Sequence, residues 1–326
     1  MEQDDQVRLQ EALDQALDGD TIHLPGMEYT ITSGNVWIEK GIVLVGTGIS
    51  PDSTALTGRT RLTGNQDVVI TNTANGLEIH GIAFAVAGGV DFGTIAATSN
   101  VNNVRLVRCN FETSLHLSTS GSPSLAVGTI IDGCVLPAGV NCGNAAGTFI
   151  RNCIVNGSSA TLYSLRGAGD QVTVENCFLF DRADNTSNAG ALYRNNIFLR
   201  SVEGPYTPTE QSYFVDNLWV GPTSLNMNGV LAGSNNQLAT NIAAVFQTPI
   251  PSLDPFDWTS NYHPVPGSLG TTMAASEVGI YGGSALSAWK DGALPFNPHW
   301  DQFYAPGATN GGILQGVQLR GTAQTH

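Results

Sequence analysis

The chain has 326 residues, of which 12% are charged, and its formal net charge is −14. This acidity argues against nucleic acid and anionic membrane surfaces as partners, because both are bound through clustered Lys and Arg. No apolar run reaches the roughly 18 residues of a membrane-spanning helix, so we expect no membrane span. The 38 glycines suit a protein with many turns.

The chain opens on an amphipathic segment that predicts a helix. Apolar residues recur there with helical spacing, and Gly19 would end the helix. The predicted buried face consists of Val7, Leu9, Leu13, Ala16 and Leu17. Two segments that look like early strands follow, at 40–48 and 77–85.

A short phrase is repeated down the middle of the chain. Its copies are LVRCNF, IIDGCVL, FIRNCIV, VENCFLF, YRNNIFL and VDNLWV. Anchored on Cys109, Cys134, Cys153, Cys177, Asn196 and Leu218, they lie 25, 19, 24, 19 and 22 residues apart. This pattern predicts a strand, a tight polar turn and a second strand in each copy, and the spacing of the copies is the period of a β-solenoid coil. Leucine-rich repeats need leucines at fixed offsets, and propellers and helical repeats need longer periods.

We therefore predict an all-β solenoid, which grows by stacking coils and needs no second core. The predicted organisation is one elongated domain. Residues 1–249 would form an N-terminal capping helix and the coils, and residues 250–326 an irregular C-terminal cap and a terminal strand.

The residue two positions before each anchor alternates in charge. These residues are Asp132, Arg151, Glu175, Arg194 and Asp216. Because neighbouring strands lie about 4.8 Å apart, we expect them to form one outward ladder of ion pairs. The alternative is that Arg151 or Arg194 lies in a sugar-binding groove.

The anchor cysteines predict an inward column of buried thiols without disulfides, although adjacent coils would be close enough for one. The position just before the anchor reads Gly133, Asn152, Asn176, Asn195 and Asn217. Asparagine tolerates the left-handed backbone of a tight turn, and stacked asparagines hydrogen-bond from coil to coil.

One polar loop carries the candidate catalytic and binding groups. It contains DRADN, at 181–185, with further arginines before and after it. Candidate catalytic residues are Arg166, Asp181 and Asp184, and candidate substrate-binding residues are Arg151, Arg182, Arg194 and Arg200. Asp181 and Asp184 are also the candidates for a calcium site, because carboxylates suit this ion. A solvated turn explains the loop equally well, and His80 and His116 are expected to be surface residues.

Beyond residue 250 the repeat ends and Pro, Trp and Tyr become frequent. We expect 250–307 to cover the last coil, anchored by Trp258, Trp289 and Trp300, with stacking on sugar rings as the alternative role of these aromatics.

Residues 311–324 alternate between apolar and polar or glycine residues, as a strand does. This strand would lie along its own cap or add to the edge of a neighbouring subunit.

The coil phrases, together with LQEALDQALDGDTIHLPGMEYTI at 9–31, resemble the right-handed parallel β-helix of the pectate-lyase-like superfamily. The resemblance covers about residues 7–250. Residues 262–283 also resemble secreted β-helix proteins of gliding-type bacteria. The resemblance implies a right-handed β-helix and a secreted or cell-surface location. It leaves the activity open, since the superfamily includes lyases, hydrolases, adhesins and phage spikes.

The sequence leaves three functions open. The favoured one is a secreted or cell-surface protein with a carbohydrate-facing adhesive or structural role, whose partner is a polysaccharide or cell-surface glycan. The second is an enzyme that cleaves an acidic polysaccharide, a lyase rather than a hydrolase, because the paired carboxylates of glycosidases are absent from the coils. The third is a fibre subunit that self-associates through 311–324. No cofactor other than calcium is expected.

Overall fold

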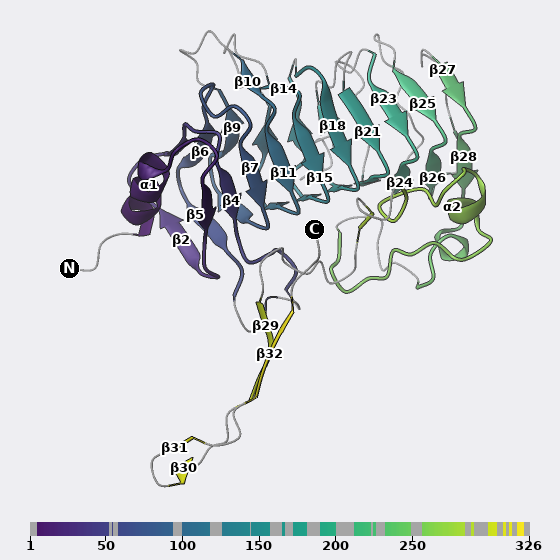
Figure 1. Ribbon diagram of the computed structural model, residues 1–326. Helices are drawn as coiled ribbons and strands as arrows, with labels where there is room; N and C mark the ends of the chain where they lie inside the picture. Colours follow the sequence, from purple (N-terminus) through teal and green to yellow (C-terminus); the bar gives the residue numbers. More distant parts are fainter. Residues whose placement is uncertain are drawn as a thin grey trace.

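A computed structural model shows a parallel β-solenoid with a helix across its N-terminal end (Figure 1). The structure describes residues 5–51, 54, 58–93, 100–117, 126–143, 145–156, 165–166, 172–180, 190–199, 212–222, 224–225, 232–248, 256–283, 288–289, 299–304, 309–310, 313–314 and 318–322. Three parallel sheets run along the stack, here called sheets A, B and C. This architecture confirms the predicted parallel β-helix.

Sheet A has ten strands, which are β1 (Thr21–His23), β4 (Val43–Val45), β7 (Glu78–His80), β11 (Arg105–Val107), β15 (Ile130–Asp132), β18 (Thr148–Arg151), β21 (Val172–Glu175), β23 (Leu192–Arg194), β25 (Tyr213–Val215) and β27 (Ala232–Ser234). Sheet B also has ten, which are β2 (Glu28–Ile31), β5 (Arg61–Gly64), β8 (Ala83–Val86), β12 (Asn110–Phe111), β16 (Val135–Leu136), β19 (Ile154–Val155), β22 (Phe178–Phe180), β24 (Ile197–Leu199), β26 (Leu218–Val220) and β28 (Gln237–Ala239).

Sheet C has six strands, which are β3 (Val36–Ile38), β6 (Asp67–Ile70), β9 (Gly89–Phe92), β13 (Leu115–His116), β17 (Val140–Asn141) and β20 (Leu165–Arg166). The remaining elements are α1 (Asp5–Gln15), β10 (Val101–Asn102), β14 (Ala126–Val127), η2 (Ile242–Ala244), α2 (Leu269–Thr272), β29 (His299–Tyr304), β30 (Thr309–Asn310), β31 (Ile313–Leu314) and β32 (Gln318–Thr322).

The core lies inside the coils, where the inward residues of successive strands stack on one another. Tyr193 stacks on Phe214 with ring centroids 4.7 Å apart, and Phe198 stacks on Trp219 at 4.5 Å. All four rings are buried. A coil that stood alone would expose them to water, so burial of apolar surface couples each coil to the next.

The chain turns from sheet A to sheet B through one residue in the left-handed conformation, followed by one inward residue. The left-handed residues include Asn152 (φ 50°), Asn176 (φ 52°) and Asn195 (φ 55°), as predicted. Gly133 takes the same conformation at φ 62°. Glycine and asparagine tolerate this backbone better than other residues, which explains their repetition in the sequence.

The inward residues of these turns form a continuous hydrogen-bonded column, here called the inner ladder. Its members are Cys109, Cys134, Cys153, Cys177, Asn196, Asn217 and Asn236. Each side chain donates to a carbonyl of the preceding coil, as Asn196 Nδ2 does to Val174 O at 2.9 Å. The next coil supplies the acceptor for several backbone groups, as when Cys177 N–H donates to Asn196 Oδ1 at 2.9 Å. A thiol and an amide therefore fill the same role.

The cysteines are free and buried, as predicted. Burial raises the pKa of the Cys134 and Cys177 thiols, and it raises the pKa of Cys142, outside the ladder, to about 12. The thiols of Cys134, Cys142 and Cys177 are therefore neutral inside the protein.

The predicted register is wrong by one residue in the sixth copy of the repeat. Arg194 pairs with Val215, and Asp216 takes the left-handed turn position at φ 56°. Asn217 rather than Leu218 is the anchor, because its amide bonds to both Asn196 and Asn236 within the ladder. Asp216 therefore does not extend the charged ladder of the preceding coils.

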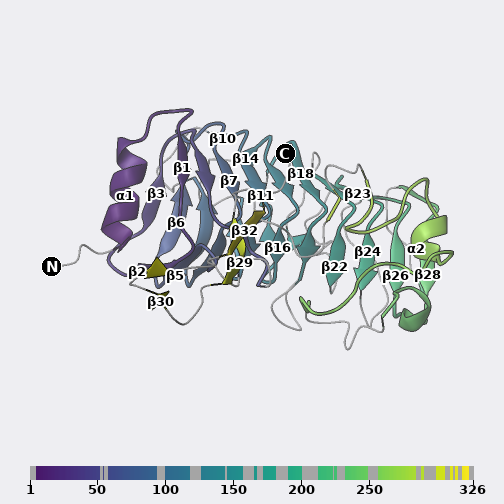
Figure 2. The same ribbon diagram turned by 60° about the horizontal axis from the view of Figure 1, so that its bottom comes forward.

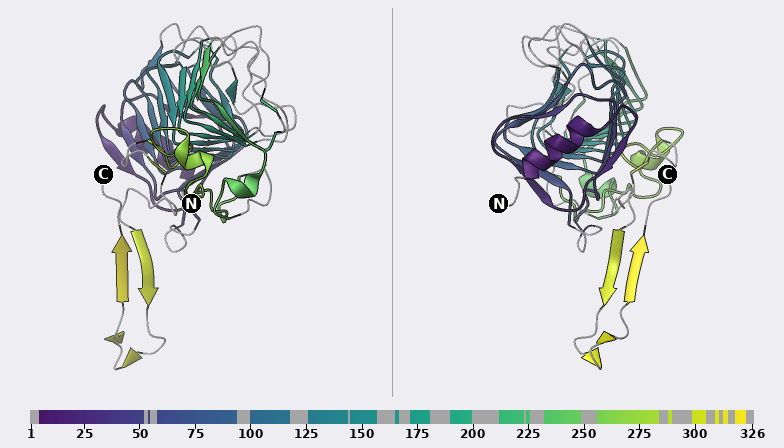
Figure 3. Two further views of the ribbon diagram at one scale, coloured as in Figure 1. Left: turned by 90° about the vertical axis from the view of Figure 1, so that its right-hand side faces the viewer. Right: turned by 60° about the vertical axis from the view of Figure 1, so that its left-hand side comes forward.

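Helix α1 lies across the N-terminal opening of the solenoid (Figure 3, right). Leu9, Leu13 and Ala16 are buried as predicted, but Val7 and Leu17 are 40% and 70% exposed, which corrects their assignment to the buried face. Gln6 is buried instead. Its Oε1 accepts from the backbone N–H of Thr32 and of Ser33, because the strand edge beneath the helix presents polar groups.

The later strands of sheet B are apolar on both faces. Leu179 and Phe198 point into the solenoid, while their neighbours Phe178, Phe180 and Ile197 point outward and are also buried. The outward residues are covered by the returning segment 256–283, which lies along the side of the stack (Figure 2). Its described part thus packs beside sheet B, whereas the sequence predicted a cover for the last coil.

The turn residues hold this segment in place. Asn152 Nδ2 donates to Ile280 O at 2.8 Å and to Gly282 O at 2.9 Å, and Gly279 N–H donates to Asn195 O at 2.7 Å. The outward residues of sheet B and the buried residues of the returning segment form a second hydrophobic cluster, separate from the core inside the coils. Trp258 and Trp289 pack against this cluster, and the side chain of Trp300 lies outside the described residues.

A hairpin of β29 and β32 projects from the coils, with β30 and β31 at its tip (Figures 1 and 3). The predicted strand at 311–324 contains β31 and β32, and β32 pairs antiparallel with β29 of the same chain. Self-association through 311–324 stays a prediction.

We predict that Asn196→Gly lowers the free energy of unfolding by about 2–4 kcal/mol. The substitution leaves the buried Cys177 N–H and Val174 C=O without their partners and loosens the backbone. The matched control is Asn195→Gly, at the adjacent left-handed position, which should change stability by about 1 kcal/mol or less. Urea denaturation of both variants tests this, and equal losses would refute the ladder's role.

Candidate functional site

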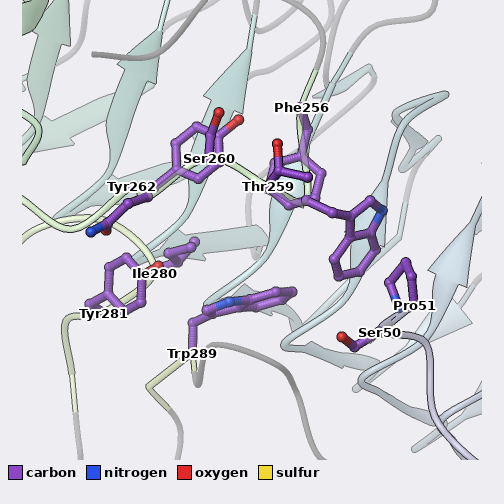
Figure 4. A pocket seen from close by; sticks show the side chains of 11 residues that line it. Ser50, Pro51, Phe256, Thr259, Ser260, Tyr262, Ile280, Tyr281 and Trp289 are labelled. Atoms are coloured by element: carbon purple, nitrogen blue, oxygen red, sulfur yellow. The ribbon is translucent and has the colours of Figure 1, made fainter. Parts of the chain in front are cut away.

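A pocket opens between the returning segment and the early loop at 49–51 (Figure 4). Its volume is about 410 Å³, and its walls are aromatic. The lining residues are Ser50, Pro51, Phe256, Trp258, Thr259, Ser260, Asn261, Tyr262, Ile280, Tyr281 and Trp289. Segments about 200 residues apart in the sequence thus meet around one hollow.

The floor of the pocket belongs to the second hydrophobic cluster. Tyr262 and Ile280 are buried, and the Tyr262 ring lies 5.5 Å from that of Phe178 on sheet B. The Tyr262 hydroxyl accepts a 2.9 Å hydrogen bond from the backbone N–H of Asp257. These contacts anchor the loop on the rigid solenoid, which is how binding loops are commonly positioned.

The polar rim of the pocket is a tight turn around one carboxylate. Asp257 Oδ1 accepts from Thr259 N–H at 2.9 Å, and Oδ2 accepts from the hydroxyls of Thr259 and Ser260. The bonds from Thr259 and Ser260 lower the pKa of Asp257, so the carboxylate is charged at neutral pH. The rim therefore presents the hydroxyls of Thr259 and Ser260 and the amide of Asn261 beside aromatic walls.

The walls are rings that are only half buried. Trp258 and Trp289 lie with ring centroids 6.4 Å apart, and Tyr281 is stacked on His263 at 3.6 Å. Trp258, Tyr281 and Trp289 all line the pocket, and Figure 4 shows Tyr281 and Trp289 there. Such a site suits a ligand with both apolar and hydroxylated faces.

A second polar constellation lies on the outward face of sheet C. Four residues are aligned across adjacent strands, which we call the sheet C row: Asp91, His116, Asn141 and Arg166. The row places one side chain about every 4.8 Å along the solenoid. For Arg166 the structure describes the backbone alone, and the register puts it next to Asn141.

An Asp–His pair is the chemical centre of this row. His116 Nδ1 lies 2.7 Å from Asp91 Oδ1, with about a third of the histidine side chain exposed. Asn141 Oδ1 accepts from Gly143 N–H at 3.2 Å. When the imidazole is neutral and Nδ1–H donates to Asp91, Nε2 becomes a proton acceptor. His116 can therefore accept a proton beside the amide of Asn141.

Asp67 lies near this pair. Burial, and then the charge of Asp91, raise its pKa, while Asn35 and His116 lower it in part. A carboxyl whose pKa is raised thus lies near one that is paired with histidine.

The predicted arginines on sheet A have carboxylate partners. Arg151 Nη2 lies 2.7 Å from Asp132 Oδ2, and Arg194 Nη2 lies 2.6 Å from Glu175 Oε2. This is the ladder of ion pairs expected from the sequence, and it neither adjoins the aromatic pocket nor forms part of the sheet C row.

The remaining predicted residues, Asp181, Arg182, Asp184 and Arg200, lie outside the described residues.

Sequence reasoning missed Asp91 and Asn141 and treated His116 as an ordinary surface residue. A pattern that predicts them is present, because the four residues of the row are spaced by 25 residues throughout. The first three also share flanks, as VDF, LHL and VNC. A fixed period of this kind places outward residues in one row.

No protein-family model matches the chain, and no curated protein matches it. Among the described residues, no group of three or more His, Cys, Asp or Glu side chains is placed to hold a metal ion. None of the described helices is long and apolar enough to cross a membrane.

We predict that Asp67→Asn raises the melting temperature more at about pH 7 than at about pH 4. The folded pKa of Asp67 lies above the unfolded value of 3.8, so the wild type loses stability as the pH rises from that value through the folded pKa. Asparagine does not ionise and removes this loss.

The matched control for Asp67→Asn is Asp257→Asn, for which the pH dependence of the change in melting temperature should have the opposite sign. The pKa of Asp257 is lowered, so its contribution is present at neutral pH and is lost as the pH falls. Calorimetry at both pH values tests the pair, and pH-independent shifts would contradict the assignment.

Proposed function

We propose that this protein binds a glycan in the aromatic pocket, outside the cell, in an adhesive or structural role. The observation that carries the proposal is the pairing of half-buried Trp258 and Trp289 with a polar rim of Thr259, Ser260 and Asn261. Sugar rings have an apolar C–H face and a hydroxylated edge, so they match both parts of the pocket.

The pocket has the size and rigidity that binding requires. Its volume of about 410 Å³ lies in the range of small-ligand sites, and its floor is part of the hydrophobic cluster. A site that is formed before the ligand arrives loses little conformational entropy on binding. The low content of charged residues and the many turn residues fit an extracellular solenoid.

We predict that Trp258→Ala and Trp289→Ala each weaken glycan binding by about tenfold or more, because a buried tryptophan contact is lost. The matched control is Trp37→Ala, at an exposed tryptophan on β3 of sheet C, which should bind as the wild type does. Affinity electrophoresis against a panel of neutral and acidic polysaccharides measures this. Loss of binding in Trp37→Ala alone would place the glycan on sheet C and overturn the proposal.

A second candidate function is the cleavage of an acidic polysaccharide, which the sheet C row favours. His116, held by Asp91, would take the proton from the carbon next to a uronate carboxyl group. Asn141 and Arg166 would hold that carboxylate. The C–O bond to the next sugar then breaks, a C=C bond forms, and the proton on His116 passes to the leaving oxygen.

For this candidate we predict that His116→Ala abolishes the formation of unsaturated sugar ends, because no proton acceptor is left. The matched control is His80→Ala on sheet A, where His80 Nε2 lies 3.0 Å from Glu78 in a similar pair. Ultraviolet absorbance of the unsaturated product measures the reaction. Absence of product in the wild type, or equal activity in both variants, would exclude the sheet C row as a lyase site.

A further inference from the structure

The outward face of sheet A carries two parallel rows of side chains, and Figure 1 looks onto this face. The apolar row consists of Ile130, Phe149, Thr173, Leu192 and Tyr213. The charged row consists of Asp132, Arg151, Glu175 and Arg194, and it continues into Val107 at one end and Val215 at the other. Both rows follow from the register, since every second residue of a strand faces outward.

The apolar row is accessible. Phe149 is 47% exposed and Tyr213 is 39% exposed, and the three residues between and beside them are half buried. A row of this kind on a regular sheet is typical of an interaction surface rather than of isolated exposed residues.

The charged row alternates strictly in sign, and its members are paired within the chain. Arg151 contacts Asp132, and Arg194 contacts Glu175. The arginine side chains are nevertheless 41% and 46% exposed, so they can contact a further carboxylate. Because each charge already has a partner, covering this face would leave none of them unpaired.

The signs of the charges along the charged row are complementary to the same signs taken in the reverse order. Read in chain order it is −, +, −, +, and read backwards it is +, −, +, −. A two-fold axis parallel to the strands, between β18 and β21, would lay the row of a second copy over the first in reverse order. Asp132 then faces Arg194 of the second copy, and Arg151 faces Glu175 of the second copy.

The same axis matches the residues around the charged row. Val107 faces Val215 of the second copy at both ends of the charged row. In the apolar row Ile130 faces Leu192 of the second copy, and next to it Arg105 faces Tyr213, a pairing that favours a cation–π contact. No like charges oppose each other anywhere along the two rows.

We propose that two copies of this chain associate face to face through sheet A, about this two-fold axis. A closed two-fold interface uses one patch twice, so the patch must complement itself. The alternating charged row has this property, and in the row beside it Ile130 faces Leu192 and Phe149 faces Thr173 of the second copy. The proposal is independent of glycan binding, since the aromatic pocket lies elsewhere.

A pair of charge reversals tests the interface. Arg151→Glu and Glu175→Arg should each weaken dimerisation by at least about a hundredfold, because each opposes like charges twice across the axis. An equimolar mixture of the two variants should dimerise again. The new carboxylate of Arg151→Glu in one copy then faces the new guanidinium of Glu175→Arg in the other. Analytical ultracentrifugation over a range of concentrations measures all three, and Phe149→Ser should weaken the wild-type dimer through the apolar row.

Matched controls come from sheet B, where Arg61 Nη2 lies 2.8 Å from Glu112 Oε2. Arg61→Glu and Glu112→Arg change the net charge equally but lie off sheet A, so they should leave the dimer intact. Thermal melts of every variant separate loss of folding from loss of association. A wild type that stays monomeric, a dimer that survives both sheet A reversals, or a mixture that fails to dimerise would overturn the proposal. A monomeric wild type whose glycan binding is lost in Phe149→Ser would assign the face to a glycan instead.

Discussion

The inner ladder at the turn between sheets A and B sets the register on which the rest of the structure depends. Each side chain from Cys109 to Asn236 donates to the preceding coil, and Asn196 and Asn217 also bond directly to each other. Buried polar groups of this kind are costly when unpaired. If one coil were displaced by one residue, several of these buried polar groups would lose their hydrogen-bond partners at once. The ladder therefore disfavours a shift of register between coils more strongly than apolar contacts do.

Fixed register turns a repeated sequence into rows of side chains. The charged row on sheet A and the sheet C row both arise because outward residues in successive coils stand about one strand spacing apart. The two rows differ in chemistry. On sheet A the arginines and carboxylates form ion pairs with one another, whereas on sheet C the imidazole of His116 is paired with Asp91 through Nδ1.

The aromatic pocket follows from a different constraint, the double-sided burial of sheet B. Phe178, Phe180 and Ile197 point outward and need cover, which the returning segment 256–283 supplies. That segment is tied to the turn residues through Asn152 and Asn195. Trp258 of this segment and Trp289 beyond it line the pocket together with Ser50 and Pro51 of the early loop.

The sequence by itself determined the period, the parallel solenoid, the left-handed asparagines and the buried thiols, because each depends on local backbone preference or on alternation along one strand. It misplaced Asp216 and Asn217 by one residue, since both residue types suit a left-handed turn and only contacts with neighbouring coils distinguish them. The Asp91–His116 pair was implicit in a 25-residue spacing. The sequence did not predict the aromatic pocket. Trp258 and Ser50 come together only after the whole stack has formed and the chain has returned along it, and no local sequence pattern encodes a contact between residues so far apart in the chain.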